Sequence, residues 1–477
     1  MNAEKAFEVV GGFGRFQIII AAIIYTANFI YAQQMVLMVI VGANSTSDTN
    51  LTTIVTEFDL YDKKWVTDLV QSLFMGGYMV GAVAFGQASD IFGRKPVILI
   101  STALMIIACF CSGLAQSWQT FAVSRFFGGI FTGGSGVSLY VMLTELVGKN
   151  MWTKIGLTYQ CCFSLGIMFL AGLSYAIQKW RIICMVSSAL GVIVMPGFFF
   201  IIPESPRWLY SVGKTDAAEK VFLKIAKWNR KGVAEVVLEP IGDEKHVETH
   251  TLLDAFRHKK LAIWLLSLAF VWFTTSLLYY GLTMSAADLT PNLYLGVALS
   301  GAVEIPAVLS CIFLMDFKWL GRRGTVFMLL LVCCAVSVTT IFVPASAGTA
   351  TLALGLTSKL CDAGIFSVIY VYSTEIFPAP LRTVALGTSS TVARIGAIIG
   401  SFIPLLLIEI PFLPYILFGA TSFLAAMLIL VLPVTLNQPL PQTIDDAIKP
   451  KYRKKNENDN QSLLPAENTE EDSGVNA

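Results

Sequence analysis

The chain has 477 residues, of which 55% are apolar and only 14% are charged, and its formal net charge is +1. A soluble domain carries about 25% charged residues, so the composition excludes a soluble enzyme or binding module and indicates a membrane protein. The near-neutral total gives no reason to expect a nucleic-acid partner.

Twelve apolar stretches of about 18–25 residues follow one another, each long enough for an α-helix to cross the ~30 Å hydrocarbon core of a bilayer. Helices are the expected spanning form, because backbone polar groups in lipid must be hydrogen-bonded within their own segment. The ten-residue alternating segments of a membrane β-barrel are missing. The stretches centre near residues 16–41, 65–87, 96–115, 120–142, 156–177, 181–202, 261–284, 292–315, 325–343, 349–373, 384–408 and 412–433.

Basic residues gather in every second loop and leave the remaining loops with only Lys63, Lys64, Lys179 and Arg181. The positive-inside rule therefore predicts that both termini are cytoplasmic, which agrees with an even number of spans. The first residues lack the apolar core and cleavage site of a signal peptide, so the first span is expected to direct insertion.

The expected organisation has five parts. Residues 1–15 form a cytoplasmic N-terminus, and residues 16–202 form a first six-helix bundle. Residues 203–260 form a central cytoplasmic loop, and residues 261–435 form a second six-helix bundle. The polar residues 436–477 are predicted to be a disordered cytoplasmic tail.

The loop that follows the first span is polar and contains two N-x-S/T acceptors, at Asn44 and Asn50. Asn44 lies close to the membrane, so Asn50 is the better glycosylation site. In the tail, Asp459, Leu463 and Leu464 have the spacing of an acidic dileucine sorting signal, a short pattern that often arises by chance. A sorting adaptor bound there would favour endolysosomal residence, whereas the plasma membrane is otherwise expected.

No chemistry of an enzyme stands out in the sequence. The histidines His246, His250 and His258 lack metal-ligand spacing, and there is no glycine-rich phosphate-binding loop. All nine cysteines lie in predicted spans, so no disulfide framework is expected. We therefore expect no catalytic residue, metal or cofactor.

The chain repeats itself about 230 residues apart, which predicts two homologous halves. Tyr140, Val141, Thr144 and Glu145 recur as Tyr370, Val371, Thr374 and Glu375, and Pro203 recurs as Pro433. Two related sets of membrane helices are typical of a secondary transporter, with the substrate site between the halves near the bilayer midplane.

The sequence GQASDIFGRKP ends the second span and predicts a latch between helices on the cytoplasmic side. In it, Asp90 is expected to accept hydrogen bonds from a neighbouring helix start, while Arg94 bonds carbonyls or a carboxylate. Gly93 allows the tight turn. In the second half Arg322 and Arg323 are present, but the expected aspartate position holds Lys318 and Asp316 comes two residues earlier, which predicts a shifted or weaker latch.

Other charged residues are expected to gate or brace the cytoplasmic side. We interpret Arg125 in the glycine-rich fourth span as a structural hydrogen-bonding hub. Each of the two repeated glutamates has basic residues nearby, Lys149 or Lys154 for Glu145 and Arg382 for Glu375, and each set is interpreted as an ion-pair gate. The opposite charges of Glu204 and Arg207 are expected to form a further cluster that opens and closes with them.

Several motifs together resemble one transporter family. The GRK motif and PESPRWL at Pro203–Leu209 are similar to the sugar-porter and organic-ion-transporter group of the major facilitator superfamily. The second half, with WFTTSLLYYGL, YVYSTEIFPAPLR and LNQPLPQTIDDA, resembles solute carrier family 22, and the Gln-Gln-x-Ser-Gly motif of the sugar porters is missing. The resemblance runs from about Ala6 to Ala447 and looks closest to the branch that contains member 15. It implies a major facilitator fold, an all-α membrane protein with twelve transmembrane helices in two pseudo-symmetric six-helix bundles.

Ionisable residues inside spans cost roughly 2.5–3.5 kcal/mol on insertion scales and are candidates for a functional site. Glu304 and Arg394 lie in the middle of the eighth and eleventh spans, where they either pair with each other or the backbone, or line the substrate cavity. Lys359 and Asp362 are three residues apart on one helix face and can pair with each other.

The family resemblance implies roles for some of these positions. Glu304 matches an acidic position associated with organic cation binding, and Arg394 matches one that is basic in anion and zwitterion carriers. Tyr279 matches a substrate-contacting position, and Val308 replaces a second basic residue of the anion carriers. Further candidates, weighed against simple packing, are Tyr280, Tyr294, Asn28 and Gln34.

We therefore expect a carrier of small organic cations or zwitterions, betaine- or carnitine-like, that works by alternating access. An organic anion transporter is the first alternative, and a non-transporting membrane sensor with the same fold is the second. The sequence does not name the substrate or a coupling ion.

Overall fold

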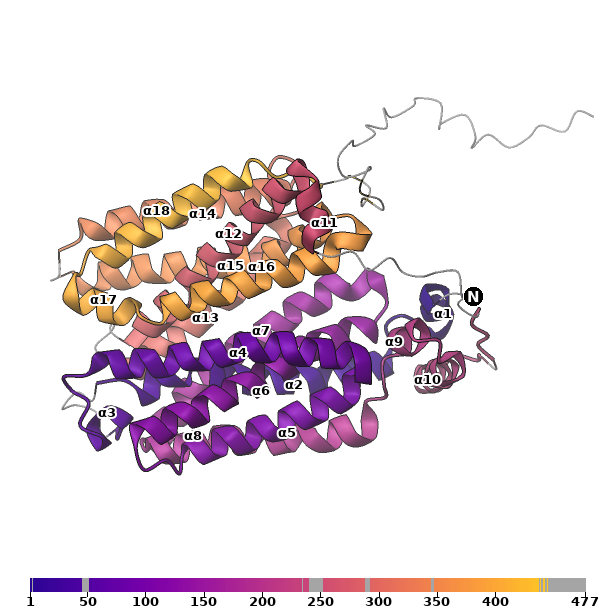
Figure 1. The fold of residues 1–477 in the computed structure, drawn as a ribbon, viewed down its shortest axis with the longest axis horizontal. Coiled ribbons are helices and arrows are strands. Elements are labelled where there is room, and N and C mark those ends of the chain that lie inside the picture. The colour runs from indigo at the N-terminus through magenta and orange to yellow at the C-terminus, as the bar shows by residue number, and fades with distance from the viewer. Residues whose placement is uncertain are drawn as a thin grey trace, which may run out of the picture.

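The computed structural model of the protein describes residues 1, 3–44, 51–233, 235–239, 252–287, 292–344, 347–436, 438, 441 and 444. Within these ranges the chain is helical, and its extended segments form one isolated bridge, between Thr52 and Lys179. Figure 1 shows the helices as two groups that lie side by side. The all-α fold predicted from the sequence is confirmed.

Eleven segments of the described chain are long and apolar enough to cross a membrane. They are α2 (Arg15–Val41), α4 (Lys64–Phe92), α5 (Arg94–Ser112), α6 (Trp118–Glu145), α7 (Trp152–Ile177), the segment that starts with α8 (Trp180–Ala189), α12 (Lys259–Met284), α13 (Leu293–Leu314), α14 (Gly321–Ile341), α15 (Gly348–Ile376) and the segment of α16 (Ala379–Gly400) and α17 (Ile403–Glu409). A twelfth apolar helix, α18 (Leu413–Ile429), has 17 residues.

Two of the predicted spans are not single α-helices. After α8, the sixth span continues as a 3₁₀ turn at Leu190–Val194 and a π-helical turn at Gly197–Ile201, with Pro196 between them. The eleventh span breaks between α16 and α17, where Pro404 stands in the first turn of α17. Proline lacks the amide hydrogen that continues a helix, which accounts for the interruption at each place.

Helices within each half approach closely because glycines stand at the contacts. A Cβ on Gly77, Gly81, Gly129 or Gly133 would collide with a backbone carbonyl of the facing helix, in the contact between α4 and α6. In the second half, Gly396 packs in the same way against the carbonyl of Phe273 on α12. Such small residues allow the tight backbone packing that membrane helices use.

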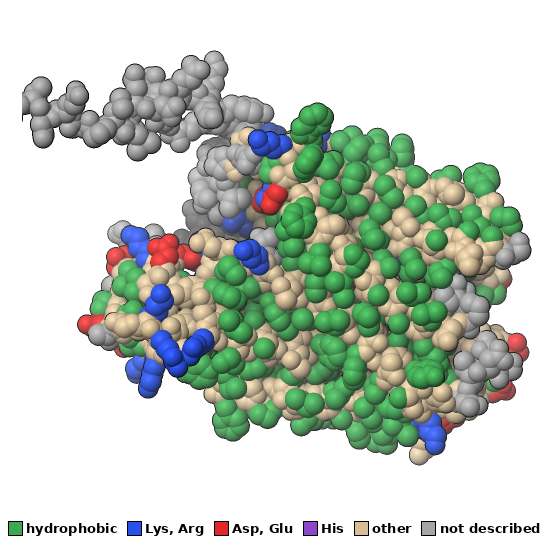
Figure 2. All heavy atoms as spheres, turned by 180° about the vertical axis from the view of Figure 1, so that it is seen from behind, with side chains coloured by type: hydrophobic (Ala, Val, Ile, Leu, Met, Phe, Trp, Pro, Cys, Tyr) green, Lys and Arg blue, Asp and Glu red, His purple; other side chains and the backbone are tan. Residues whose placement is uncertain are grey.

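Short helices mark the two ends of the molecule (Figure 1). The helices α1 (Ala3–Val10), α9 (Pro206–Ser211) and α10 (Thr215–Trp228) cover one end, here called the α10 end. The four-residue helix α3 (Ile54–Glu57) marks the opposite α3 end. Figure 2 shows hydrophobic side chains over the long sides and charged side chains gathered at the two ends, as expected for a protein surrounded by lipid.

The two halves are joined by hydrogen bonds towards the α3 end. Ser72 of α4 donates to the carbonyl of Ile398 at 3.0 Å, and the amide of Leu405 donates to the Asp68 carboxylate at 3.1 Å. The rings of Tyr175 and Tyr294 meet with centroids 5.5 Å apart. At the α10 end, by contrast, every ion pair found among the described residues stays within one half.

Candidate functional site: a charged and aromatic centre between the halves

Glu304 lies in the middle of α13, has no solvent-exposed surface, and connects four helices. Its carboxylate accepts hydrogen bonds from the hydroxyl of Tyr279 on α12 at 2.6 Å and from the hydroxyl of Ser164 on α7 at 2.7 Å. Lys359 of α15 forms an ion pair with it at 3.2 Å. Because α7 belongs to the first half, this carboxylate is a direct polar link between the halves.

Lys359 is bound on all sides. Besides Glu304, its ammonium donates to the hydroxyl of Thr283 and, at 3.4 Å, to the carbonyl of Tyr279, and it lies 3.1 Å from the centre of the Tyr279 ring. The structure therefore pairs Lys359 with Glu304. The spacing of Lys359 and Asp362 along one helix had suggested a pair between those two residues instead. The partner differs because the packing of α12, α13 and α15 directs the lysine side chain across the helices.

Arg394 of α16 has no carboxylate partner among the described residues, and it does not pair with Glu304. Its guanidinium lies 4.2 Å from the centre of the Tyr78 ring, beside Tyr280. The side chain is half-buried, and its Nε has no hydrogen-bond partner in the described part of the chain. A positive charge thus remains at the interface of the halves with aromatic rings as its immediate neighbours.

Tyrosines surround this centre. The rings of Tyr140 and Tyr370 face each other across the two halves at 6.3 Å, and Tyr140 also contacts Tyr159 at 5.5 Å. Tyr279 and Tyr280 pack against each other at 5.2 Å and so connect the surroundings of Glu304 with those of Arg394. Sequence reasoning did not select Tyr140, Tyr159 or Tyr370 as site residues. Tyr140 and Tyr370 occupy equivalent positions of the internal repeat, which was a signal that could have identified them.

Three other candidates are not brought to the charged centre. The amide of Asn28 donates to the carbonyl of Tyr159 at 2.7 Å, which ties α2 to α7. The amide of Gln34 bonds Ser187 at 3.1 Å. Tyr294 lies nearer the α3 end, against Tyr175.

Arg125 has the surroundings of a structural hub. It is fully buried, donates to the carbonyl of Gln34 at 2.7 Å, and lies 4.1 Å from the centre of the Phe74 ring. Its contacts all lie within the first half, so they brace α6 against α2 and α4.

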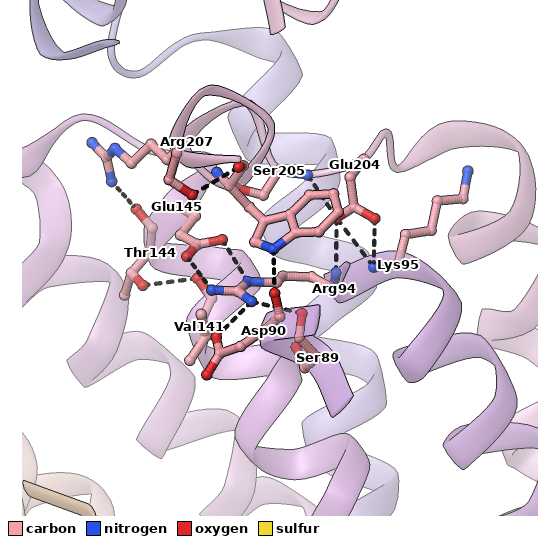
Figure 3. A network of polar contacts seen from close by, with 12 residues as sticks. Ser89, Asp90, Arg94, Lys95, Val141, Thr144, Glu145, Glu204, Ser205 and Arg207 are labelled. Atoms are coloured by element: carbon pink, nitrogen blue, oxygen red, sulfur yellow. Dashed lines mark hydrogen bonds and ion pairs between the residues drawn. The ribbon is translucent and has the colours of Figure 1, made fainter. Parts of the chain in front are cut away.

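The first latch centres on Arg94 at the start of α5 (Figure 3). Its guanidinium donates two hydrogen bonds of 3.1 Å to the Glu145 carboxylate, and it also reaches Asp90 and the carbonyl of Ser89, each at 2.7 Å. Such a bidentate arginine–carboxylate pair fixes both distance and orientation. The expected pairing of Glu145 with Lys149 or Lys154 is wrong for this structure, because Arg94 occupies the carboxylate and Lys149 pairs with Glu4.

Glu204 has a different role from the one expected. It does not pair with Arg207, and its carboxylate accepts from the backbone amides of Arg94 and Lys95 at the start of α5, as Figure 3 shows. A carboxylate at a helix N-terminus satisfies free amides and complements the helix dipole. The turn places Gly93 at φ 103°, a left-handed conformation that favours glycine.

Arg207 caps the other end of a helix. It donates to the carbonyls of Thr144 at 2.6 Å and Val147 at 3.0 Å at the end of α6, and it pairs with Glu4 at 3.2 Å. Burial lowers the pKa of the Arg207 guanidinium, and the neighbouring Glu4 opposes that change. The two charges of the PESPRWL motif therefore stabilise two different helix termini instead of each other.

The second half contains a related but different latch. Arg322 pairs with Glu375 and with Asp316, each at 3.2 Å, so Asp316 takes the role that Lys318 cannot. Arg323 donates to the carbonyl of Leu432 at 3.1 Å. Among the described residues no side chain caps the first turn of α14, and Val434 stands where the first half has Glu204.

Arg382 does not form the pair expected for it. Glu375 is already bound by Arg322 and by the hydroxyl of Thr435, whereas Nε and one terminal nitrogen of Arg382 have no hydrogen-bond partner among the described residues. Burial lowers the pKa of this guanidinium.

At the α3 end, Glu57 accepts hydrogen bonds from Arg181 at 2.6 Å and from the Trp180 indole at 2.6 Å. The Arg181 hydrogen bonds hold the pKa of Glu57 below its usual value. Asn44 is exposed next to the end of α2. The other predicted modification and sorting residues, Asn50, Asp459, Leu463 and Leu464, lie outside the described residues.

Comparisons with known proteins agree on one kind of molecule. Residues 18–443 match the family model described as "sugar (and other) transporter". The solute carrier family 22 member 15-like protein of Xenopus tropicalis is 34% identical over 95% of this chain and 98% of its own length. An organic cation transporter protein of Drosophila melanogaster is 35% identical over 83% of this chain and 74% of its own.

Among solved structures, the xylose transporter XylE from E. coli in a partially occluded inward open conformation has a TM-score of 0.65. It is 16% identical in sequence, and the match covers 86% of this chain and 96% of XylE. At this identity the likeness concerns the fold alone.

Proposed function

Since this chain belongs to solute carrier family 22 and is a multi-pass membrane transporter of the major facilitator type, we propose that it carries small organic zwitterions by alternating access. The substrate class is a molecule with an ammonium group and a carboxylate, such as a betaine. The observation that carries the proposal is the free positive charge of Arg394 within a ring of tyrosines between the halves.

Arg394 is suited to hold the carboxylate of such a substrate. A guanidinium presents paired N–H donors that match the two oxygens of a carboxylate, and such charge-assisted bonds are the strongest that side chains form. Arg394 has no protein carboxylate to satisfy these donors in the described part of the chain, and part of its surface stays accessible.

The tyrosines are suited to hold the ammonium end. Tyr140, Tyr159 and Tyr370 are half-buried between the halves and contact one another or face each other. Aromatic faces attract quaternary ammonium groups by about 0.5–2 kcal/mol each, depending on desolvation. Glu304 adds negative potential behind Tyr279, but its charge is largely offset by Lys359.

That offset makes a small organic anion the second candidate substrate. With Glu304 paired to Lys359, the charge at the interface of the halves that has no oppositely charged partner among the described residues is the positive one of Arg394. The same pairing disfavours a simple organic cation, because such a cation must compete with Lys359 for Glu304.

The positive-inside rule supports an orientation in which both termini are cytoplasmic and the α10 end faces the cytoplasm. The hydrogen bonds that join the halves at the α3 end then correspond to closure on the outside, so the structure is inward-facing. Two nitrogens of Arg382 have no hydrogen-bond partner among the described residues. When the α10 end closes, they can therefore pair with a carboxylate of the first half. A plasma-membrane location, with glycan at Asn50 or Asn44 on the outer side, fits this orientation.

The test compares uptake of three labelled probes, glycine betaine, tetraethylammonium and benzoate, in cells that express the full chain. Arg394→Ala is expected to lower betaine and benzoate uptake by roughly 10–100-fold, since a hydrogen bond to a charged group contributes about 1.5–3 kcal/mol. Uptake of tetraethylammonium, which has no carboxylate, should fall much less. Arg394→Lys should recover part of the loss.

Arg230→Ala is the matched control, because it removes an exposed arginine of the central loop. Surface labelling must show equal amounts of each variant. An equal loss for all three probes would assign Arg394 a structural role, and preference for benzoate over betaine in the unaltered protein would establish the anion candidate. Absence of saturable flux of any probe, with the protein present at the surface, would contradict the proposal.

A further inference from the structure

Three ionisable groups are buried together in the interior of the second half. Glu304 and Asp362 have no exposed surface, and Lys359 is 2% exposed. Two carboxylates thus stand beside one ammonium in a region that no other described cation enters. Buried charges are tolerated only when they are paired or neutralised, so one carboxylate of this group requires a further partner.

Asp362 is the carboxylate without a partner. Neither of its two oxygens has a hydrogen-bond partner among the described residues. The three N–H donors of Lys359, one turn away on α15, are directed to Glu304, to Thr283 and to the carbonyl of Tyr279. The ammonium therefore cannot serve Asp362 in this arrangement.

The surroundings of Asp362 favour a proton over a metal ion as its partner. The titratable groups that act on it are Glu304, Lys359, Tyr279 and the thiols of Cys333 and Cys361. A metal ion requires several ligands close together, and in the described part of the chain no three His, Cys, Asp or Glu side chains lie close enough to hold one. A carboxylic acid needs no such shell.

We propose that Asp362 binds a coupling proton, and that Lys359 moves between Glu304 and Asp362 as the transporter changes conformation. The inference rests on the proposed transport function and adds the driving ion to it. Protonation forms an O–H bond on Asp362, and deprotonation returns that proton to water without any other bond change.

The link to conformational change runs through Ser164. Its hydroxyl belongs to the first half and holds Glu304 of the second half at 2.7 Å, so relative movement of the halves breaks this bond. Glu304 then loses one of its hydrogen-bond donors. Substrate binding nearby changes how strongly the Glu304 carboxylate attracts the Lys359 ammonium. When the ammonium moves one turn to Asp362, opposite charges attract and the acid releases its proton.

A small hollow gives Lys359 a connection towards the α3 end. It is lined by Lys359 together with Leu282, Gly296, Ser300 and Leu356, on the helices α12, α13 and α15, and by Ala286 of the 3₁₀ turn that follows α12. The hydroxyl of Ser300 has no partner among the described residues and faces the same helices. The hollow thus places a second polar group, the Ser300 hydroxyl, on the α3-end side of Lys359.

Infrared spectroscopy of the purified full-length protein tests the proton directly and needs no substrate. The unaltered protein at neutral pH should show a carboxylic-acid C=O band that Asp362→Asn lacks and Glu409→Gln, which removes an exposed carboxylate, retains. Identical spectra of the unaltered protein and Asp362→Asn would overturn the proposal.

Flux measurements in proteoliposomes test the coupling. With labelled glycine betaine and a pH-sensitive dye inside the vesicles, an inward proton gradient should drive accumulation up to about tenfold per pH unit for one proton per substrate. Asp362→Asn should keep betaine exchange and lose the gradient-driven accumulation, and Asp362→Glu should restore it.

The two proposals fail in different ways. Betaine flux that follows a Na⁺ gradient, or that ignores pH in the unaltered protein, would overturn proton coupling and leave the transport function standing. An infrared band from Asp362 without flux of any probe would support the proton site and contradict the proposed substrate class.

Discussion

At the scale of single residues, Glu304 and Lys359 place opposite charges where water does not reach either of them. Each group loses its hydration free energy on burial. The ion pair between the two groups offsets this loss, together with the hydrogen bonds that Glu304 accepts from Tyr279 and Ser164 and the one that Lys359 donates to Thr283. The pair is therefore more sensitive to the loss of one member than to the loss of both.

A double-mutant cycle measures this sensitivity. Lys359→Met should destabilise the protein by about 3–5 kcal/mol, because it leaves the buried Glu304 carboxylate without its cation. Glu304→Gln should destabilise it less, because Lys359 can then turn to Asp362, and the double variant should be less destabilised than the sum of the two. The measurement is thermal unfolding of the purified protein in detergent. Glu57→Gln, at the partly exposed pair with Arg181, serves as the control and should change the stability by no more than about 1 kcal/mol. Strict additivity would show that the two buried charges do not depend on each other.

Sequence reasoning selected Glu304, Arg394, Lys359 and Asp362 correctly as unusual residues, because charge inside an apolar stretch is visible without a structure. It could not assign their partners. Spacing along one helix suggested Lys359 with Asp362, whereas the structure pairs Lys359 with a residue of another helix. That choice depends on how α12, α13 and α15 pack, which periodicity does not encode.

At the scale of elements, the two latches differ in how the helix that follows them begins. In the first half the Glu204 carboxylate binds the amides of Arg94 and Lys95, and in the second half Val434 leaves the start of α14 without such a cap. A substitution that supplies a carboxylate at the second latch should therefore stabilise the protein.

Val434→Glu is expected to add the missing interaction. Val434 is 58% exposed, so a longer side chain fits, and a carboxylate at a helix N-terminus contributes about 0.3–1 kcal/mol. Unfolding temperature should rise, and the increase should shrink when high salt screens the charge. Val434→Gln has the same length without the charge and should give a smaller increase. Equal effects of both substitutions would attribute the gain to side-chain size alone.

The sequence predicted the spans well, since hydropathy over about twenty residues is a strong signal. It did not predict the interruptions at Pro196 and Pro404, because membrane helices also tolerate proline where neighbours satisfy the freed carbonyls. The roles of Glu204 and Arg207 were misjudged for a related reason. Their adjacency in sequence suggested a pair, while the turn between them directs one to α5 and the other to α6.

At the scale of the whole molecule, the halves meet near the α3 end and keep separate ion pairs at the α10 end. Tyr175 and Tyr294, whose rings are 5.5 Å apart, report on this closure. A thiol at each of these positions should be joined by a short, reducible bifunctional reagent only while the α3 end is closed.

Joining Tyr175→Cys and Tyr294→Cys should abolish betaine uptake, because the α3 end must open once per cycle, and reduction should restore it. The measurement is labelled uptake before and after the reagent. Each single variant treated in the same way controls for the nine native cysteines, of which Cys111 is exposed. Undiminished uptake after complete joining would mean that the two helices do not separate during transport.

The internal repeat predicted two halves, and the structure contains them. It could not indicate which end is closed, because every state of an alternating-access carrier is made from the same sequence. The relative energy of such states depends on a few contacts between the halves, for example the bond between Ser72 and the carbonyl of Ile398.

The glycines between α4 and α6 bear on inherited variation in the gene. A glycine codon becomes an alanine codon by one base change, and the exchange is usually ranked as mild. At Gly81 or Gly133 the added methyl group would meet a backbone carbonyl that cannot rotate away, so the allele should behave as a loss of the whole protein. Exchange of Phe313 for leucine, at a side chain that is 76% exposed, should pass unnoticed although it alters more atoms.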